Sequence, residues 1–105
     1  MTSNYKLSIC IPTYNRAAYI GETLASIISQ SGDDIEIVIV DGASTDNTAD
    51  VVNEFQGRFE NIHYHREKQN NGVDADLAKS VALAQGEYCW LMSSDDILAA
   101  GAIQR

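Results

Sequence analysis

The sequence predicts an α/β fold with an open, mainly parallel sheet and helices on both of its faces. Short apolar runs rich in β-branched residues recur about 25 to 30 residues apart, with amphipathic stretches between them. Strands joined through helices at this interval pair in parallel through right-handed crossovers. Polar residues gather where three of the strands end, and open α/β sheets bind ligands at that edge.

Four strands are expected, at 7–11, 35–40, 62–65 and 87–92. The first, the second and the last are apolar enough to be buried strands of a parallel sheet. Cys10 and Cys89 fall within two of them without CxxC spacing, so we interpret both as small core residues.

Four helices are expected between and after these strands. The first should end near 31–32, the second begins behind the capping residues 44–46, the third ends at Gly86, and 97–105 opens the fourth. The apolar positions that define the first three helices are Ile20, Leu24, Ile27 and Ile28, then Val52, Phe55 and Phe59, then Val73, Leu77, Val81 and Ala84.

The composition indicates one small acidic domain. The chain has 105 residues, 45% hydrophobic content and a formal net charge of −8. Its basic residues are scattered along the sequence, so we expect neither a nucleic-acid groove nor binding to an anionic membrane. No apolar run reaches the roughly 20 residues of a membrane span, and no export signal is visible. A cytoplasmic location is therefore expected.

The most distinctive polar cluster is the pair Asp95 and Asp96, which follows the last strand. Carboxylate oxygens suit Mg²⁺ and Mn²⁺, and a bound divalent cation can hold an anionic diphosphate that the acidic chain would itself repel. Alone, such a pair more often stabilises a helix start, here the helix that opens at Ile97. Its place beside two other polar loops favours a metal site.

Those two loops follow the first two strands. In residues 12–16 (PTYNR), Tyr14 could stack on a nucleobase and Arg16 could meet a phosphate; the alternative is a helix-entry loop whose tyrosine covers the edge of the core. In residues 41–46 (DGASTD), Asp41 and backbone amides could bind a nucleoside. The alternative there is a turn and a helix cap.

Two further groups are interpreted mainly as structural. Asp74 and Asp76 lie in the first turn of the third helix, where they stabilise the helix dipole, and a sugar or ribose contact is the lesser alternative. His63 and His65 alternate on a strand without a third metal ligand in reach. The chain has no GxxxxGKS/T, GxGxxG or GxSxG motif, which argues against P-loop, dinucleotide-binding and serine-hydrolase classes.

Together, the loops resemble the nucleotide-binding half of family 2 glycosyltransferases, which are inverting enzymes with a GT-A fold. Residues 8–16 (SICIPTYNR) look like the family's opening strand, and 38–48 (VIVDGASTDNT) looks like its second signature. Residues 84–88 (AQGEY) and the acidic stretch after them are similar to the approach to the metal-binding DxD motif. Residues 72–77 (GVDADL) and 90–96 (WLMSSDD) resemble the abequosyltransferase-like branch.

The resemblance implies that residues 1–105 are the Rossmann-like half of a GT-A fold, which binds a nucleotide-diphosphate sugar with Mn²⁺ or Mg²⁺ for polysaccharide or glycan synthesis. Pro12, Thr13 and Tyr14 would cradle the base, and Asp41 with Ser44 would frame the nucleoside. The substrate-binding residues implied are Pro12, Thr13, Tyr14, Arg16, Asp41, Ser44, Asp76, Ser94 and Asp96, and the metal ligand is Asp95.

The sequence departs from the family's pattern at two positions. Ser93 stands at the first aspartate of the DxD motif, and Gly42 replaces an acid that reads the base in many members. The family places its catalytic base and its glycan or lipid-linked acceptor in a C-terminal half, at the inner membrane face in the full-length protein. We therefore expect residues 1–105 to bind donor without turnover. A non-catalytic α/β interaction module and a nucleotidyltransferase-like domain remain as alternatives.

Overall fold

The computed structural model describes residues 5–29, 34–59, 61–70, 72–86 and 88–91. Strands and helices alternate along this part of the chain: β1 (Leu7–Thr13), α1 (Ala17–Ile28), β2 (Ile35–Asp41), α2 (Thr48–Gln56), β3 (Ile62–Arg66), α3 (Val73–Leu83) and β4 (Tyr88–Leu91). The helix expected at 97–105 lies outside the described residues. Among the described helices, none is long and apolar enough to cross a membrane.

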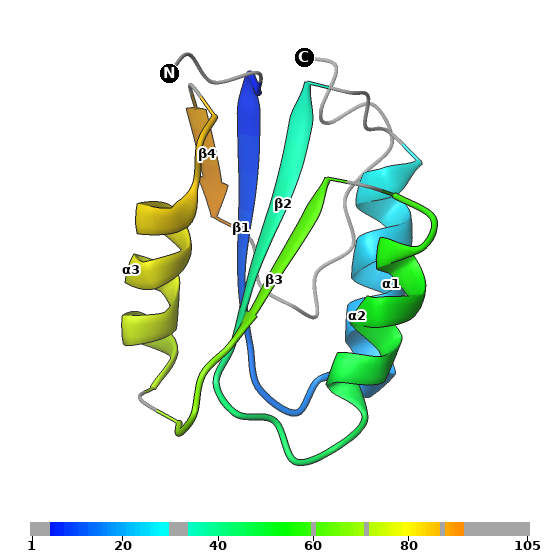
Figure 1. Ribbon diagram of the computed structural model, residues 1–105, viewed down its shortest axis with the longest axis vertical. Coiled ribbons are helices and arrows are strands. Elements are labelled where there is room, and N and C mark those ends of the chain that lie inside the picture. Colours follow the sequence, from blue (N-terminus) through cyan, green and yellow to red (C-terminus); the bar gives the residue numbers. More distant parts are fainter. Residues whose placement is uncertain (1–4, 30–33, 60, 71, 87, 92–105) are drawn as a thin grey trace.

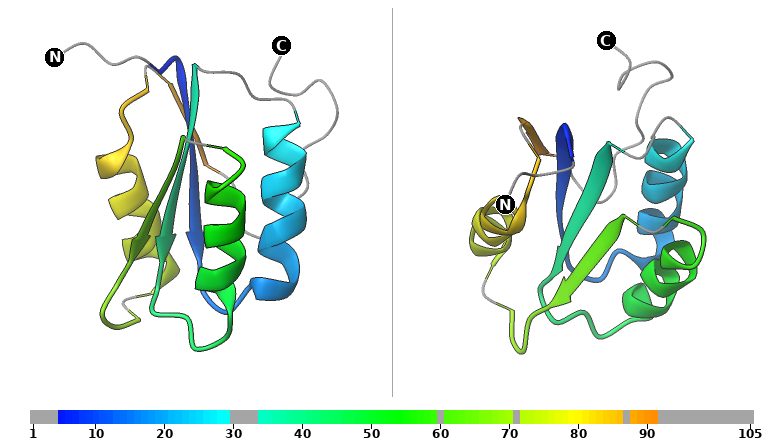
Figure 2. Two further views of the ribbon diagram at one scale, coloured as in Figure 1. Left: turned by 45° about the vertical axis from the view of Figure 1, so that its right-hand side comes forward. Right: turned by 45° about the horizontal axis from the view of Figure 1, so that its top comes forward.

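The four strands form one parallel sheet in the order β3-β2-β1-β4. Helices α1 and α2 cover one face of the sheet, and α3 covers the other (Figure 1, Figure 2). The predicted open parallel sheet with helices on both faces is confirmed. Because the strands all run in one direction, the loops that follow β1, β2 and β3 emerge at one edge, the carboxyl end of the sheet, at the bottom of Figure 1.

The main core lies between the sheet and the pair α1 and α2. Strand β2 is central, and all seven of its residues are buried. Alternate residues of the two inner strands meet the apolar faces predicted for the helices, and each such side chain contributes about 1.5 to 3 kcal/mol by leaving water. The contributing residues are Ile9, Ile11, Ile37 and Ile39 from the strands and Ile20, Leu24, Ile27 and Val52 from the helices.

A buried carboxylate lies on the other face of β2, near the amino end of the sheet. Glu36 is 1% exposed, and its Oε2 accepts hydrogen bonds from Ser8 Oγ and from the backbone N–H of Gln85. Its Oε1 lies 3.4 Å from His63 Nε2. Ser8 Oγ in turn accepts a hydrogen bond from the N–H of Gly86 at 2.7 Å. This network ties the turn between α3 and β4 to the two central strands.

The prediction that Gly86 ends the third helix is wrong. Helix α3 ends at Leu83, and Ala84 is already extended, with φ −66° and ψ 137°. Gly86 instead passes close to β1, since a Cβ there would lie 2.6 Å from Ser8 Oγ and 2.8 Å from Ser8 N. The position needs glycine for this approach of two backbones.

The prediction that the last strand is buried is also wrong. In β4, Trp90 is half-buried against the core, while Tyr88, Cys89 and Leu91 are exposed. The strand pairs with β1 on one side and with no other described strand, so it is an edge of the described sheet. Cys89 is therefore an exposed thiol. Cys10 is buried as expected, and burial raises its pKa to about 11.

Candidate functional site

The loops that follow β1 and β2 start side by side at the carboxyl end of the sheet. Thr13 and Asp41 are register partners and the last residues of their strands. The backbone N–H of Gly42 then donates to the carbonyl oxygen of Thr13 at 2.9 Å. Two of the polar clusters that the sequence predicts on one edge are thus brought together.

Asn15 joins the two loops. Its side-chain oxygen accepts hydrogen bonds from the N–H groups of Thr45 at 2.8 Å and Asp46 at 3.3 Å, and its own N–H donates to Ser44 Oγ at 2.9 Å. Asn15 has φ 52°, a left-handed conformation that asparagine adopts more readily than most residues. Sequence reasoning did not assign Asn15 to the site, although an asparagine directly after a strand is a signal of such a turn.

Asp41 is fully buried and supports the second loop from below. Its Oδ1 accepts hydrogen bonds from Ser44 N at 2.8 Å and Ser44 Oγ at 2.6 Å, and its Oδ2 accepts one from the hydroxyl of Tyr64. Burial and this carboxylate raise the pKa of Tyr64. Arg66 fixes the same loop by donating to the carbonyl oxygen of Ser44 at 2.8 Å. The polar atoms of Asp41 are therefore occupied within the protein.

Asp46 serves the starts of two helices. Its carboxylate accepts hydrogen bonds from the N–H of Ala17 at 3.2 Å, at the start of α1, and from the N–H of Thr48 at 3.0 Å, at the start of α2. Burial acts to raise the pKa of Asp46, but the hydrogen bonds from Thr48 and Ala17 outweigh it and hold the pKa below its usual value. The N-cap residue of α2 is Asn47 and not one of the predicted residues 44–46, but Asp46 still accepts hydrogen bonds from the first N–H groups of both helices.

Asp76 reaches the same region from α3, on the other face of the sheet. It is 3% exposed, and an ideal Cβ built on Gly42 would lie 2.6 Å from its Oδ2. Burial, followed by the charges of Glu67 and Asp41, raises the pKa of Asp76, while Lys79 lowers it. No side chain or N–H of the described residues donates a hydrogen bond to this carboxylate. The structure therefore places Asp76 beside the loop that contains Asp41.

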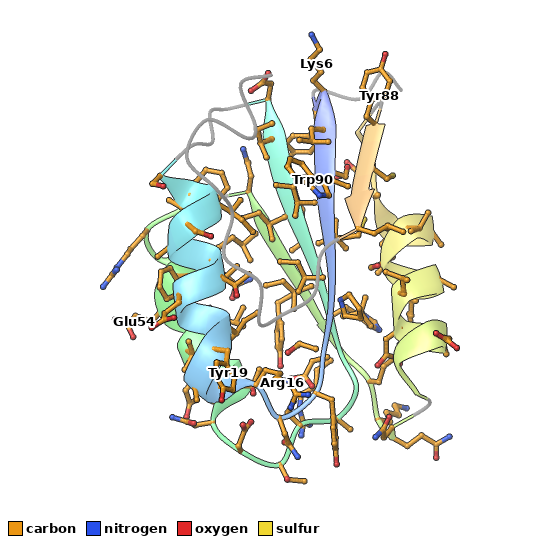
Figure 3. All side chains as sticks on the ribbon, turned by 180° about the vertical axis from the view of Figure 1, so that it is seen from behind. Lys6, Arg16, Tyr19, Glu54, Tyr88 and Trp90 are labelled. Atoms are coloured by element: carbon orange, nitrogen blue, oxygen red, sulfur yellow. The ribbon has the colours of Figure 1, made fainter. Side chains whose placement is uncertain are left out.

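The remaining predicted residues of the first loop differ in exposure. Pro12 and Thr13 belong to β1 and are buried, whereas Tyr14 is 40% exposed and Arg16 is exposed. Arg16 lies where the chain enters α1, beside the carboxyl end of β1 (Figure 3). The hydroxyl oxygen of Thr13 is buried and has no hydrogen-bond partner in the described part of the molecule.

The residues predicted to hold the metal lie outside the described part of the chain. Ser94, Asp95 and Asp96 follow Leu91 of β4, where the described residues end. Strand β4 runs parallel to β1, with Leu91 beside Cys10. Among the described residues, no group of three or more His, Cys, Asp or Glu side chains is arranged to hold a metal ion. His63 and His65 are exposed on β3, in line with the structural interpretation.

Three basic residues that are scattered along the sequence meet at one place in the fold. Arg66, Lys68 and Lys79 line a single open hollow of about 500 Å³ at the end of β3, beside α3, together with His65, Glu67 and Gln69. Lys79 Nζ is paired with Glu67 Oε1 at 2.9 Å. The residues are distant in sequence but adjacent in the fold because α3 packs behind the sheet, which composition alone does not reveal.

Comparisons with known proteins agree with this geometry. The sequence profile described as Glycosyl transferase family 2 matches residues 8–105. Abequosyltransferase RfbV of Salmonella typhimurium is 46% identical over 96 residues, which cover 89% of this chain and 29% of that protein. The chain thus spans less than a third of the length of this relative.

Two solved structures share the fold. S. aureus TarS in complex with UDP-GlcNAc matches with a TM-score of 0.88 and 29% identity, over 94% of this chain and 29% of that chain. The mannosyltransferase PcManGT from Pyrobaculum calidifontis, in complex with GDP-Man and Mn²⁺, matches with a TM-score of 0.82 and 27% identity, over 95% of this chain and 30% of that chain.

Proposed function

Because this chain belongs to glycosyltransferase family 2, we propose that it is the donor-binding half of an enzyme that moves a sugar from a nucleotide-diphosphate sugar to an acceptor hydroxyl. The transfer inverts the anomeric carbon and serves polysaccharide or glycan synthesis. The observation that carries the proposal is the carboxyl end of the sheet, where braced loops surround polar groups that lack partners. The sugar nucleotides bound to TarS and PcManGT support it.

Each predicted residue that the structure describes has a role compatible with its position. The exposed ring of Tyr14 stacks on the base, above a floor formed by Pro12 and Thr13. The guanidinium of Arg16 meets phosphate oxygens. Asp41 and Ser44 frame the nucleoside through the loop that they hold in place, and Asp76 contacts the nucleoside from α3.

The chemistry of the last predicted residues fits a divalent cation. Carboxylates such as Asp95, with Ser94 and Asp96 beside it, are the hard oxygen ligands that Mn²⁺ or Mg²⁺ takes. A cation held there supplies charge neutralisation for the diphosphate. The Mn²⁺ in the PcManGT complex supports this assignment. The protein's own residues bind and orient the donor, while the base that activates the acceptor is not assigned to any described residue.

Calorimetry with UDP and CDP, with and without Mn²⁺, tests the proposal. We expect binding that requires Mn²⁺ and that falls at least about tenfold in the Asp95→Ala variant, since a metal ligand is lost. The matched control is Asp50→Ala, which removes an exposed acid on α2 and should leave the affinity unchanged. Equal binding by the Asp95→Ala variant, or in the presence of a chelator, would remove the metal-bridged site.

An interaction module is the second candidate, favoured by apolar side chains exposed on α3 and β4. Val81, Leu83, Tyr88 and Leu91 are 40% to 64% exposed. Sedimentation separates the candidates, since a stable oligomer that ignores nucleotide and Mn²⁺ supports the module. The family match favours the transferase over a nucleotidyltransferase-like domain.

A further inference from the structure

Asp76 is a buried carboxylate without a hydrogen-bond donor among the described residues. It is 3% exposed, and it sits at the carboxyl end of the sheet, where ligands of such folds bind. A carboxylate that accepts no hydrogen bond from the protein is available to a ligand that donates one. Thr13 Oγ1, at the end of the neighbouring strand β1, is a buried polar atom without a partner among the described residues. Both observations point to a ligand that completes this end of the sheet.

Gly42 creates the space that Asp76 occupies. A Cβ at this position would lie 2.6 Å from Asp76 Oδ2, too close for any side chain to coexist with the carboxylate as placed. The backbone of Gly42 does not have a positive φ, so its conformation does not itself require glycine. The carboxylate of Asp76, on α3, therefore lies where the side chain of a residue other than glycine at position 42 would lie.

The charges around Asp76 select the kind of group it can bind. Asp41 and Glu67 are acidic, and the nearby Lys79 is already paired with Glu67 at 2.9 Å. A phosphate would be repelled from this position. An uncharged N–H or amino group would instead give the carboxylate the hydrogen bond that it lacks.

The order of the sheet determines which part of a sugar nucleotide reaches Asp76. If the diphosphate lies at the end of β4, as the proposed function requires, the nucleoside extends over β1 to β2, because the strand order is β2-β1-β4 at this side. Two strand spacings are about 10 Å. The base then lies over the ends of β1 and β2, above Pro12 and Thr13 and next to Gly42.

We propose that Asp76 recognises the N–H edge of the nucleobase and sets the base preference of the donor site, in the space left free by Gly42. This inference rests on the proposed function. A site with a buried acceptor binds a base that donates a hydrogen bond to it much more tightly than a base that does not.

Calorimetry with UDP, CDP, GDP and ADP in the presence of Mn²⁺ tests this inference. The wild-type chain should prefer one base, and Asp76→Ala should lower its affinity for that nucleotide about tenfold or more while changing the others less. The double variant Gly42→Asp/Asp76→Ala returns the acid from the β2 loop and should restore most of the preference. The matched control is Asp74→Ala, an exposed acid in the same helical turn, which should keep the wild-type ranking.

The outcomes separate this inference from the function on which it rests. If the wild-type chain binds none of the four nucleotides, the proposed function fails and the inference fails with it. If the wild-type chain shows a preference that Asp76→Ala leaves within twofold, base recognition by Asp76 is wrong while the donor site stands. If Asp74→Ala lowered the nucleotide affinity as much as Asp76→Ala, the cause would be the removal of a negative charge and not recognition of the base, and the inference would be overturned.

Discussion

Two buried carboxylates lie at opposite ends of the sheet and differ in what surrounds them. Glu36, at the amino end, accepts hydrogen bonds from Ser8 and Gln85 and faces His63. Asp76, at the carboxyl end, is almost as buried but accepts no hydrogen bond from the described residues. The first is a completed structural network, and the second is an incomplete one. The network at the amino end has a structural role, and a carboxylate without protein partners at the carboxyl end is what the proposed ligand site requires.

We expect the largest loss of stability when Glu36, the carboxylate with protein partners, is removed. In Glu36→Ala, the N–H of Gln85 loses its acceptor and the turn into β4 loses its tie to β2. We expect the free energy of unfolding to fall by about 3 kcal/mol, measured by urea denaturation. The control is Glu54→Ala, whose ion pair with Arg58 is exposed and should matter by less than about 1 kcal/mol. A loss as small as in the control would show that the network is not structural.

Gly86→Ala tests how tightly the backbone packs at the amino end of the sheet. Its new Cβ would meet Ser8 Oγ at 2.6 Å and a backbone atom of Leu7 at 2.9 Å, so we expect a loss of about 2 kcal/mol. Gly21→Ala in α1 is the matched control, because its Cβ would make ordinary contacts of 3.5 Å and 3.6 Å. That variant should gain up to about 1 kcal/mol from helix propensity. Thermal unfolding of both variants would refute the packing argument if they moved in the same direction.

Asp46→Asn tests an acid at the carboxyl end that does have its partners. We expect a loss of about 1 kcal/mol at neutral pH, because charged hydrogen bonds to the starts of two helices are weakened. The pKa of Asp46 is lowered below its usual 3.8 on folding, so its contribution is present above that value and is lost as the pH falls through the folded-state pKa. Denaturation at several pH values should show the difference between variant and wild type shrinking in acid.

Asp76→Asn should have the smallest effect on stability, and the opposite sign. The pKa of Asp76 is raised above its usual 3.8 on folding, so ionising this group destabilises the fold as the pH rises through the folded-state pKa. We expect the variant to gain up to about 1 kcal/mol at neutral pH and nothing below that usual value. Urea denaturation at two pH values measures the gain. A loss at neutral pH would mean that Asp76 has a structural partner, and the comparison would fail.

The sequence predicted the sheet and its helices well because their patterns are local. Ile9, Ile11, Ile37 and Ile39 alternate as buried strands do, and the apolar faces of α1 and α2 repeat at the right spacing. The apolar face predicted for α3 is wrong, because the buried side chains described on that helix are Asp76 and Ser80, while Val81 is 40% exposed. The exposure of β4 was missed, since an apolar run is the same in an edge strand as in a central one. The role of Gly86 was missed because its contact is with β1, far away in the sequence.

The sequence predicted that the first two polar loops would meet, but not which of their acids have hydrogen-bond partners within the protein. Loops after parallel strands meet at one edge whatever their details, so the first two polar clusters came together as expected. Which acids are occupied and which are free depends on packing between α3 and the sheet. That is why the contact between Asp76 and Gly42, and the bridge made by Asn15, emerge only in three dimensions.

The most direct test of this account is a crystal structure of the chain with Mn²⁺ and the nucleoside diphosphate that it prefers. We predict an N–H or amino group of the base within about 3 Å of the Asp76 carboxylate, beside Gly42, with the contacts of Glu36 unchanged. A base bound elsewhere, with Asp76 surrounded only by protein or water, would contradict the claim that this carboxylate is kept unpaired for the ligand.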